Sequence, residues 1–544
     1  MSDEVMSVLS NGYFIALVIF LVYISLVIIL KKKGFLAKHN ASAWGPIIMW
    51  RTKRGKDAID WLARPKRFWL AMSAVGKVIC LLVMIFMMCL LIWEATLVSS
   101  IPADKAPGPE MILGIPGLNP IIPIWYGIIG LIVAIVCHEF AHGIMTRVGN
   151  MGVKALGIML LVVPLGAFVE PEEEDLRKAS RKKRMNVYAA GPATNIVIAI
   201  VCMVVFASLL MGSLQPVSQN PVVLGVGDSS PLSLAEIGYG SQFMSIGGIY
   251  INNTAAFNNI AIADAGQNVT VVYTNSGTSK TKEVYSGVCL VSVSRGGPAF
   301  KGNVTTGMLI YSMNDTKIRS YMDFQSVLGN TTAYSYVNIT ALKYDKLAGA
   351  YLVDPTVTRI LLGSRLAEFY GNDTGRAPIG FHDYGYMGVT ATYMGGSVST
   401  ASDIKVFLAE PYKDMTSPWD FFSRTLRYIA LPFQGLAPIQ APISDLFVPG
   451  GIFTGMDPGL FWFGANCFYW IFWINLMVGM TNVLPAVPLD GGYLFKDGMD
   501  SIVLKFRKNA TEEERNRIVG TITFGLAFFV LFLIVWQFIG PRIV

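Results

Sequence analysis

The sequence predicts a polytopic α-helical membrane protein with about six transmembrane helices and a β-rich insert on the extracytoplasmic side. Composition is the first observation: 53% of the 544 residues are hydrophobic, only 15% are charged, and the apolar residues gather in runs long enough to cross a bilayer. The second is that Lys and Arg concentrate between these runs. The third is a change of texture over residues 213–418, where short Val, Ile and Tyr runs alternate with Gly, Asn, Ser and Thr.

The N-terminal region, residues 1–120, is expected to hold two membrane helices joined by a basic loop. The apolar run Tyr13–Leu30 follows an acidic start, which is typical of a retained anchor and not of a signal peptide. Between Lys31 and Arg67 there are eleven Lys and Arg residues, so the positive-inside rule places this loop in the cytoplasm. A nucleic-acid-binding patch is the alternative, but membrane topology already explains the charge, and no nucleic-acid partner is expected. The second helix, Phe68–Val98, then leads outward.

The third span lies within residues 121–148 and carries ionisable side chains near its inner end: His138, Glu139 and His142. An ionisable group in a membrane helix costs about 2.5–3.5 kcal/mol on insertion scales, which favours a functional interpretation. The spacing is H-E-x-x-H, and residues four apart share one helix face, so both imidazoles can reach one Zn²⁺ while the glutamate accepts a proton from water. The alternative is a pair of histidines satisfied inside a bundle, but the chain has only 4 histidines.

The rest of the first membrane half, residues 121–212, is expected to contain a hairpin and a fourth span. Residues 154–170 are rich in β-branched side chains and contain two glycines and a proline, which favours a short β-hairpin over another crossing. A charged, cytoplasmic segment follows. The fourth span, about 185–211, opens with A-A-G-P-A-T-N, which places Asn195 within or at the edge of the membrane.

The insert, residues 213–418, contains an internal repeat. Residues 229–257 parallel residues 296–324 with a constant offset of 67 residues, which indicates two small β-rich domains in tandem, about 222–286 and 287–362. The small-residue–Pro start, the short helix and the Gly-turn-strand resemble PDZ domains. That resemblance implies a sheet edge and groove in each copy, able to bind an extended peptide or a C-terminus by β-augmentation. A structural β-domain without a ligand is the alternative.

The C-terminal region, residues 419–544, is expected to form the second membrane half. Residues 418–440 combine aromatic side chains with two arginines and three prolines, which favours an interfacial helix or lid over a crossing. Two spans follow, Gly459–Met480 and Thr521–Ile539, separated by a polar segment.

A third metal ligand is predicted at Asp490, in the segment N-V-L-P-A-V-P-L-D-G-G. The expected topology places Asp490 at a depth similar to that of the two histidines. Pro485 and Pro488 prevent a regular helix, and irregular backbone at membrane depth is tolerated only when it is buried in protein or lines a wet cavity. Two histidines and one carboxylate, with water in the fourth position, are typical of a catalytic site for a single zinc ion. An aspartate in a surface turn or helix cap is the alternative.

These motifs together resemble the site-2 protease family of intramembrane metalloproteases. The resemblance rests on H-E-F-A-H and N-V-L-P-A-V-P-L-D-G-G, supported by A-A-G-P-A-T-N and the PDZ-like insert, and covers residues 121–212 and 459–500. It implies that His138, His142 and Asp490 bind zinc and that Glu139 is the general base. It also implies that Asn482 binds the substrate backbone or stabilises the oxyanion. Asn195 is grouped with Asn482 as a substrate or oxyanion residue, and the resemblance implies that it supports the site. For hairpin 154–170 the resemblance implies strand pairing with the substrate.

The resemblance implies hydrolysis of peptide bonds within transmembrane segments of single-span membrane proteins that have been trimmed outside the bilayer. The site would lie near the cytoplasmic side of a multi-pass protein, with the PDZ-like region outside. One alternative is a protease of the prenyl-protein-processing type, which needs a distal Glu as third ligand and leaves L-D-G-G unexplained. Another is a zinc transporter, or a PDZ-bearing scaffold with a structural metal.

Overall fold

The computed structural model describes residues 12–52, 55–98, 106, 108–111, 114–161, 163–275, 277–357, 359–370 and 382–543. The chain forms two compact units. The first combines Met1–Phe206 with Gly464–Val544, and the second is the intervening segment Ala207–Phe463.

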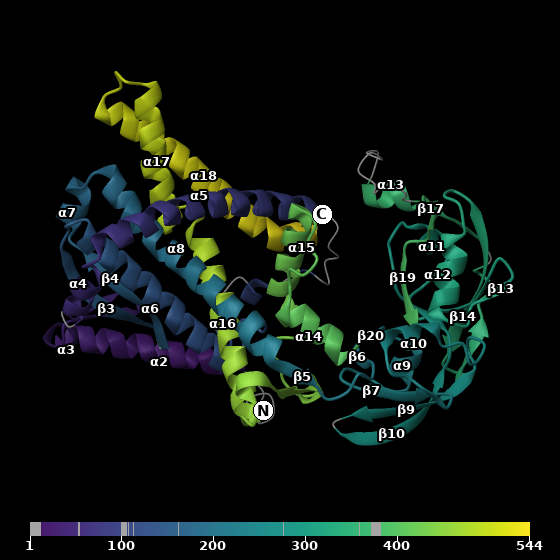
Figure 1. The fold of residues 1–544 in the computed structure, drawn as a ribbon. Helices are drawn as coiled ribbons and strands as arrows, with labels where there is room; N and C mark the ends of the chain where they lie inside the picture. Colours follow the sequence, from purple (N-terminus) through teal and green to yellow (C-terminus); the bar gives the residue numbers. More distant parts are fainter. Residues whose placement is uncertain are drawn as a thin grey trace, which may run out of the picture. The chain divides into compact units, whose positions relative to one another are not determined.

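The first unit is mainly helical (Figure 1). Its helices are α2 (Gly12–Lys32), α3 (Phe35–Lys38), α4 (Lys56–Leu62), α5 (Lys66–Leu97), α6 (Ile124–Val148), α7 (Glu173–Lys178), α8 (Arg181–Val204), α17 (Asp490–Phe506) and α18 (Glu512–Ile543), with the short η3 (Pro109–Met111). Helix α16 (Pro458–Asn482) starts in the second unit and ends in the first. The π-helical segment η4 (Val205–Met211) follows α8 directly, and together they form one continuous helix, Arg181–Met211.

Among the described residues, five helices are long and apolar enough to cross a membrane: Lys66–Leu97, Ile124–Val148, Arg181–Met211, Pro458–Asn482 and Glu512–Ile543. They coincide with five of the expected spans. Helix α2 covers the remaining expected span, but several of its side chains lie outside the described residues, so the number of six crossings stays a prediction. Helix α17 is an addition, because the polar segment after Asp490 had no predicted structure.

The first unit also contains a four-stranded antiparallel sheet in the order β1-β2-β3-β4. The predicted hairpin at 154–170 is confirmed as β3 (Val153–Leu161) and β4 (Val163–Pro171). Strands β1 (Ala41–Trp44) and β2 (Ile47–Thr52) come from the basic loop and were not predicted, although a Gly-Pro dipeptide between two apolar runs is a turn signal. Strand β2 pairs with β3, so β4 is left at the edge beside α6 (Figure 1).

Small residues mark the places where the membrane helices pack closely. A Cβ added at Gly76 of α5 would lie 2.9 Å from the Ala193 side chain of α8, and one at Gly130 of α6 would lie 2.8 Å from the Trp470 carbonyl of α16. In lipid, where apolar burial gives no net drive, such close backbone approach is a main source of helix association. These close approaches join α5 to α8 and α6 to α16.

The second unit holds two antiparallel sheets. The first has the order β10-β9-β7-β6-β20, with β8 beside β7, and the second has the order β15-β14-β12-β11-β19, with β13 beside β12 and β16 beside β14. Their strands are β6 (Val222–Val226), β7 (Gln242–Ile246), β8 (Ile249–Tyr250), β9 (Asn268–Asn275), β10 (Thr278–Tyr285), β11 (Val288–Val293), β12 (Leu309–Met313), β13 (Thr316–Lys317), β14 (Tyr336–Asp345), β15 (Ala350–Val353), β16 (Arg359–Leu361), β19 (Val389–Tyr393) and β20 (Gly396–Ser399).

Short elements complete the second unit. They are the helices α9 (Pro231–Leu234), α10 (Thr254–Asn259), α11 (Pro298–Lys301), α12 (Tyr321–Gly329), α13 (Arg365–Tyr370), α14 (Ala401–Ala409) and α15 (Pro418–Ile429), the 3-10 turns η6 (Leu431–Gln434), η7 (Ser444–Leu446) and η8 (Gly451–Phe453), and the paired strands β17 (Gly363–Ser364) with β18 (Gly385–Tyr386) and β5 (Leu214–Pro216) with β21 (Phe447–Pro449). Helix α15 has 12 residues, about 18 Å at 1.5 Å per residue, and is too short to cross a bilayer, as predicted.

The internal repeat is visible element by element. Strand β7 and strand β12 begin 67 residues apart, as do α9 and α11, β8 and β13, and α10 and α12. Each copy has its own apolar core, with Phe257 in the first and Phe324 at the matching place in the second.

The two copies are nested and not simply consecutive. Strand β19 pairs with β11 and completes the second copy, while β20, a few residues later, returns to pair with β6 of the first. Both closing strands lie beyond the ranges 222–286 and 287–362, which were drawn from the repeated segments alone.

Polar contacts and an apolar cluster join the copies. The Tyr351 hydroxyl donates to the Ser229 carbonyl at 3.2 Å, and Asp264 of the first copy accepts from Lys317 Nζ and Arg319 Nε of the second, each at 2.6 Å. The cluster comprises Ala265, Cys289, Leu309, Leu342 and Tyr351. Hydrogen bonds from Lys317 and then Arg319 lower the pKa of the Asp264 carboxyl.

We expect the Asp264→Asn substitution to loosen the contact between the copies at neutral pH and to flatten its acid dependence. A carboxyl whose pKa is lowered in the folded protein stabilises the folded contact at pH values above the ordinary aspartate pKa of about 4. This stabilisation is lost as the pH falls through the pKa of the folded protein. Hydrogen exchange of peptides around residues 264 and 317–319, at pH 7 and in acid, measures the effect in the full chain. Asp228→Asn, at an exposed carboxylate of the same copy, is the control and should match the unchanged protein.

Candidate metal centre

Helix α6 places two imidazoles on one face. His138 and His142 lie one turn apart, with ring centroids 4.7 Å apart and ring planes at 80°. Their side chains are 9% and 12% exposed, so both rings lie within the packed interior of the helices.

Asp490, the first residue of α17, faces both rings from a position about 350 residues further along the chain. Its Oδ2 lies 3.0 Å from His138 Nε2 and 3.2 Å from His142 Nε2. One ligand atom from each of the three residues lies within 4.8 Å of the other two. Within the described residues, this is the group of His, Cys, Asp or Glu side chains that lie close enough together to hold a metal ion. The three predicted ligands are therefore adjacent.

The geometry fits a zinc ion. Ligand atoms at about 2.0–2.1 Å from a tetrahedral metal are roughly 3.3 Å from one another, close to the observed N–O separations. The ring of His142 is also oriented for coordination, because its Nδ1 lies 2.8 Å from the Val187 carbonyl of α8. Nδ1–H donates to that carbonyl, which leaves the lone pair of Nε2 directed at the metal position.

Asn195 gives His138 the same support. Its amide nitrogen as assigned lies 3.3 Å from His138 Nδ1, while its buried Oδ1 has no hydrogen-bond partner among the described residues. In the opposite orientation of the amide group, His138 Nδ1–H donates to Asn195 Oδ1 and the buried oxygen gains a partner. Asn195 is fully buried beside a ligand ring, and its predicted role, in support of the site or in contact with substrate, stays a prediction.

Gly191 leaves open the space that a metal would fill. A Cβ at this position of α8 would lie 2.5 Å from His138 Nε2 and 2.6 Å from His142 Nε2. Gly491 and Gly492 meet a comparable limit, since a Cβ on either would lie within 2.5 Å of the backbone of residues 483–487. The glycines of both motifs therefore permit close backbone approach around the site.

Glu139 lies on the same helix as the histidines and contacts the edge strand β4. Its Oε2 accepts from the Val169 backbone N–H at 3.0 Å. The hairpin that the sequence predicted near the site thus reaches the expected general base. The Val187 carbonyl and Val169 amide were not predicted, because backbone groups carry no residue-type signal.

Asn482 is the last residue of α16 and is half-buried. The segment after it, residues 483–489, leads directly into α17 and Asp490. The predicted contact of Asn482 with substrate stays a prediction, as does the general-base role of Glu139.

We expect Gly191→Ala to abolish or strongly reduce metal binding, because its methyl group would occupy the space between the two Nε2 atoms. Zinc content of the purified protein, measured by atomic emission, checks this. Gly525→Ala in α18 is the matched control, since an added Cβ there meets nothing within 4 Å. Full zinc occupancy in a folded Gly191→Ala protein would contradict the placement of the metal.

Comparison with known proteins agrees with this arrangement. The model of peptidase family M50 matches residues 126–530 of the 544. An uncharacterized protein of Methanocaldococcus jannaschii is 35% identical over 162 residues, which cover 29% of this chain and 43% of that protein. The chain therefore spans less than half the length of this relative. The family match includes both motifs that supply the ligand cluster, and M50 peptidases are zinc-dependent membrane metalloproteases. The chain belongs to peptidase family M50, the site-2 protease family.

Proposed function

We propose that this protein is an intramembrane zinc metalloprotease that cleaves transmembrane segments of single-span membrane proteins. The observation that carries the proposal is that Asp490 Oδ2 lies within 3.2 Å of the Nε2 atoms of both histidines. The histidines belong to α6, a helix long and apolar enough to cross the bilayer. Glu139, next to a ligand on the same helix, is the group suited to proton transfer.

The chemistry is hydrolysis of a peptide bond. Zinc, when bound, supplies a Lewis acid that makes water nucleophilic near neutral pH and polarises the scissile carbonyl. Glu139 accepts a proton from the attacking water and returns it to the leaving amine. The Val169 N–H bonded to Oε2 holds this carboxylate in place, and Asn482 binds the substrate backbone or stabilises the oxyanion.

The substrate must unwind before it can be cut, because a transmembrane helix has all its backbone groups paired. Strand β4 supports this step, since it is the edge of its sheet and its Val169 amide contacts the proposed base. An extended substrate segment can pair along such an edge, and this would place its backbone beside Glu139. Sidedness follows from the eleven basic residues between Lys31 and Arg67, which favour an active site near the cytoplasmic face and an insert outside.

The nested PDZ-like copies are proposed to filter substrates by size, or to bind a peptide or C-terminus of substrates that have already been trimmed outside. The repeated sheet-and-helix pattern supports this proposal. In the first copy β8 pairs with β7 and α10 follows, and in the second copy β13 pairs with β12 and α12 follows.

We expect Glu139→Gln to keep its zinc and to lose cleavage of a purified single-span substrate by at least about 100-fold, the usual size of a general-base effect. Asp490→Ala should lose zinc and cleavage together. Gel-based cleavage in proteoliposomes, with zinc content measured on the same samples, separates the two effects. Glu174→Gln, at an exposed glutamate of α7, is the control and should cleave normally. A Glu139→Gln protein that still cleaves would refute the assignment.

Deleting residues 218–399 removes both copies and keeps the β5–β21 pair. We expect the shortened enzyme to cleave a substrate with a long outer domain nearly as fast as its trimmed form, whereas the full chain prefers the trimmed form. The same deletion combined with Glu139→Gln controls for contaminating proteases. An unchanged preference for trimmed substrate would rule out the filter.

A further inference from the structure

Helices α8 and α17 pack antiparallel through a series of paired side chains. Arg184 of α8 binds Asp497 of α17 with two hydrogen bonds, Nε to Oδ2 at 2.9 Å and Nη2 to Oδ1 at 2.6 Å. One turn further along α8, Tyr188 stacks on Tyr493 with ring centroids 5.2 Å apart and ring planes at 25°. One turn in the other direction, Arg181 pairs with Asp500.

These pairs keep a constant register that ends at the metal centre. Each step of three or four residues along α8 is matched by an equal step backwards along α17, as expected for two helix faces in contact. The next step reaches Gly191 on α8 and Asp490 on α17. Gly191 opens onto the two histidine Nε2 atoms, and Asp490 contacts those atoms. We call the three pairs Arg181–Asp500, Arg184–Asp497 and Tyr188–Tyr493 the α8–α17 ladder.

One end of the ladder is joined to the site and the other end to a third helix. Val187, next to Tyr188, accepts the hydrogen bond from His142 Nδ1, so α8 holds a ligand ring as well as the ladder. Asp500 at the far end also accepts from Arg515 of α18 at 2.5 Å, which joins a third helix to the ladder.

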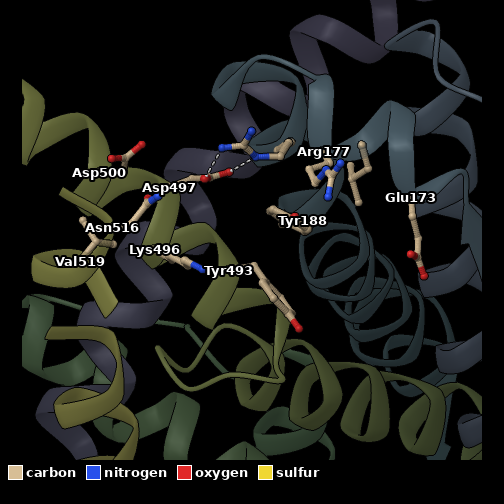
Figure 2. Close-up of a pocket in the computed structure, with 11 residues that line it drawn as sticks. Glu173, Arg177, Tyr188, Tyr493, Lys496, Asp497, Asp500, Asn516 and Val519 are labelled. Atoms are coloured by element: carbon tan, nitrogen blue, oxygen red, sulfur yellow. Dashed lines mark hydrogen bonds and ion pairs between the residues drawn. The ribbon is translucent and has the colours of Figure 1, made fainter. Parts of the chain in front are cut away.

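All members of the ladder except Arg181 line a cavity of about 370 Å³. Figure 2 shows two dashed hydrogen bonds between Asp497 and an arginine side chain. Tyr188 and Tyr493 are labelled in the same view among the residues that line the cavity. The charged pair is nevertheless largely buried, with side-chain exposures of 22% for Arg184 and 11% for Asp497. Burying such a pair costs desolvation that an apolar pair would avoid, so its best-attested use is to fix register.

Register matters here because Asp490 reaches the histidines from a separate helix. A slip of α17 by one residue would move each side chain about 1.5 Å along the axis and turn it about 100°. Either change carries the Asp490 oxygen away from its 3.0 Å and 3.2 Å contacts. The segment before α17 contains Pro485 and Pro488 and forms no regular helix, so α17 does not continue a preceding helix that would set its register.

We propose that the α8–α17 ladder is a positioning device that holds Asp490 at coordinating distance from His138 and His142. Arg184, Asp497, Tyr188 and Tyr493 act through Asp490 and are positioning residues. This inference rests on the zinc site of the proposed function and extends it to residues outside that site.

The test measures zinc affinity and not cleavage, in full-length Glu139→Gln protein reconstituted in lipid. Competition with a chelator of known affinity gives the dissociation constant for zinc alone. We expect Arg184→Asp and Asp497→Arg to weaken zinc binding about 10- to 100-fold, the range for residues that orient metal ligands. The exchanged pair, Arg184→Asp with Asp497→Arg, restores the attraction and should bring the affinity back to within about threefold.

The matched control is the Arg147–Asp60 pair, which joins α6 to α4 in the same unit without contacting α17. Arg147→Asp should leave zinc affinity unchanged. If the single ladder variants do not fold, the exchanged pair decides the matter alone. Affinity near that of the parent supports the ladder, and a folded exchanged pair with affinity lowered tenfold or more overturns it.

Two other outcomes are separable. Single variants that fold and bind zinc as tightly as the parent would show that the ladder serves stability only, and would overturn the inference while leaving the proposed function intact. A Glu139→Gln parent that binds no zinc would overturn both the zinc site and the inference.

Discussion

The need to satisfy ionisable groups at membrane depth governs the first unit. Asp490 and the two histidines meet within hydrogen-bond distance, and each histidine has a second partner, the Val187 carbonyl for His142 and the Asn195 amide for His138. An unpaired ionisable group in a membrane helix raises the free energy of insertion by about 2.5–3.5 kcal/mol on insertion scales. These partners offset that cost. The same requirement explains the backbone N–H of Val169 on Glu139.

Close backbone packing is what makes these partners reachable. Gly191 lets α8 approach both imidazoles, and Gly491 with Gly492 lets α17 turn tightly against residues 483–487. A carbonyl such as that of Val187 can accept from a ring nitrogen only when two helices come this close. The glycines and the polar contacts are therefore parts of one arrangement, in which small residues set the helix spacing and the remaining polar groups occupy the gaps.

The ligand set was predictable because each motif combines residue types with a fixed helical or turn spacing. H-E-x-x-H gives two ligands on one face, and Asp490 stands in a segment whose two prolines prevent a regular helix at membrane depth. Strands β1 and β2 were missed because eleven basic residues dominated the interpretation of that loop, and α17 was missed because its charges masked a helix. The pairing of Arg184 with Asp497 depends on a register between segments some 300 residues apart, which no local pattern encodes.

The return of β20 to the first copy affects how the insert is made. Strand β6 has β7 on one side and β20 on the other, and β20 is synthesised only after the whole second copy. As the chain leaves the ribosome, the first sheet therefore has an open edge for more than 100 residues, and such edges attract other strands. The second copy is synthesised within this interval, so the first sheet can be completed only after it, and no single cut between the copies separates them into two complete sheets.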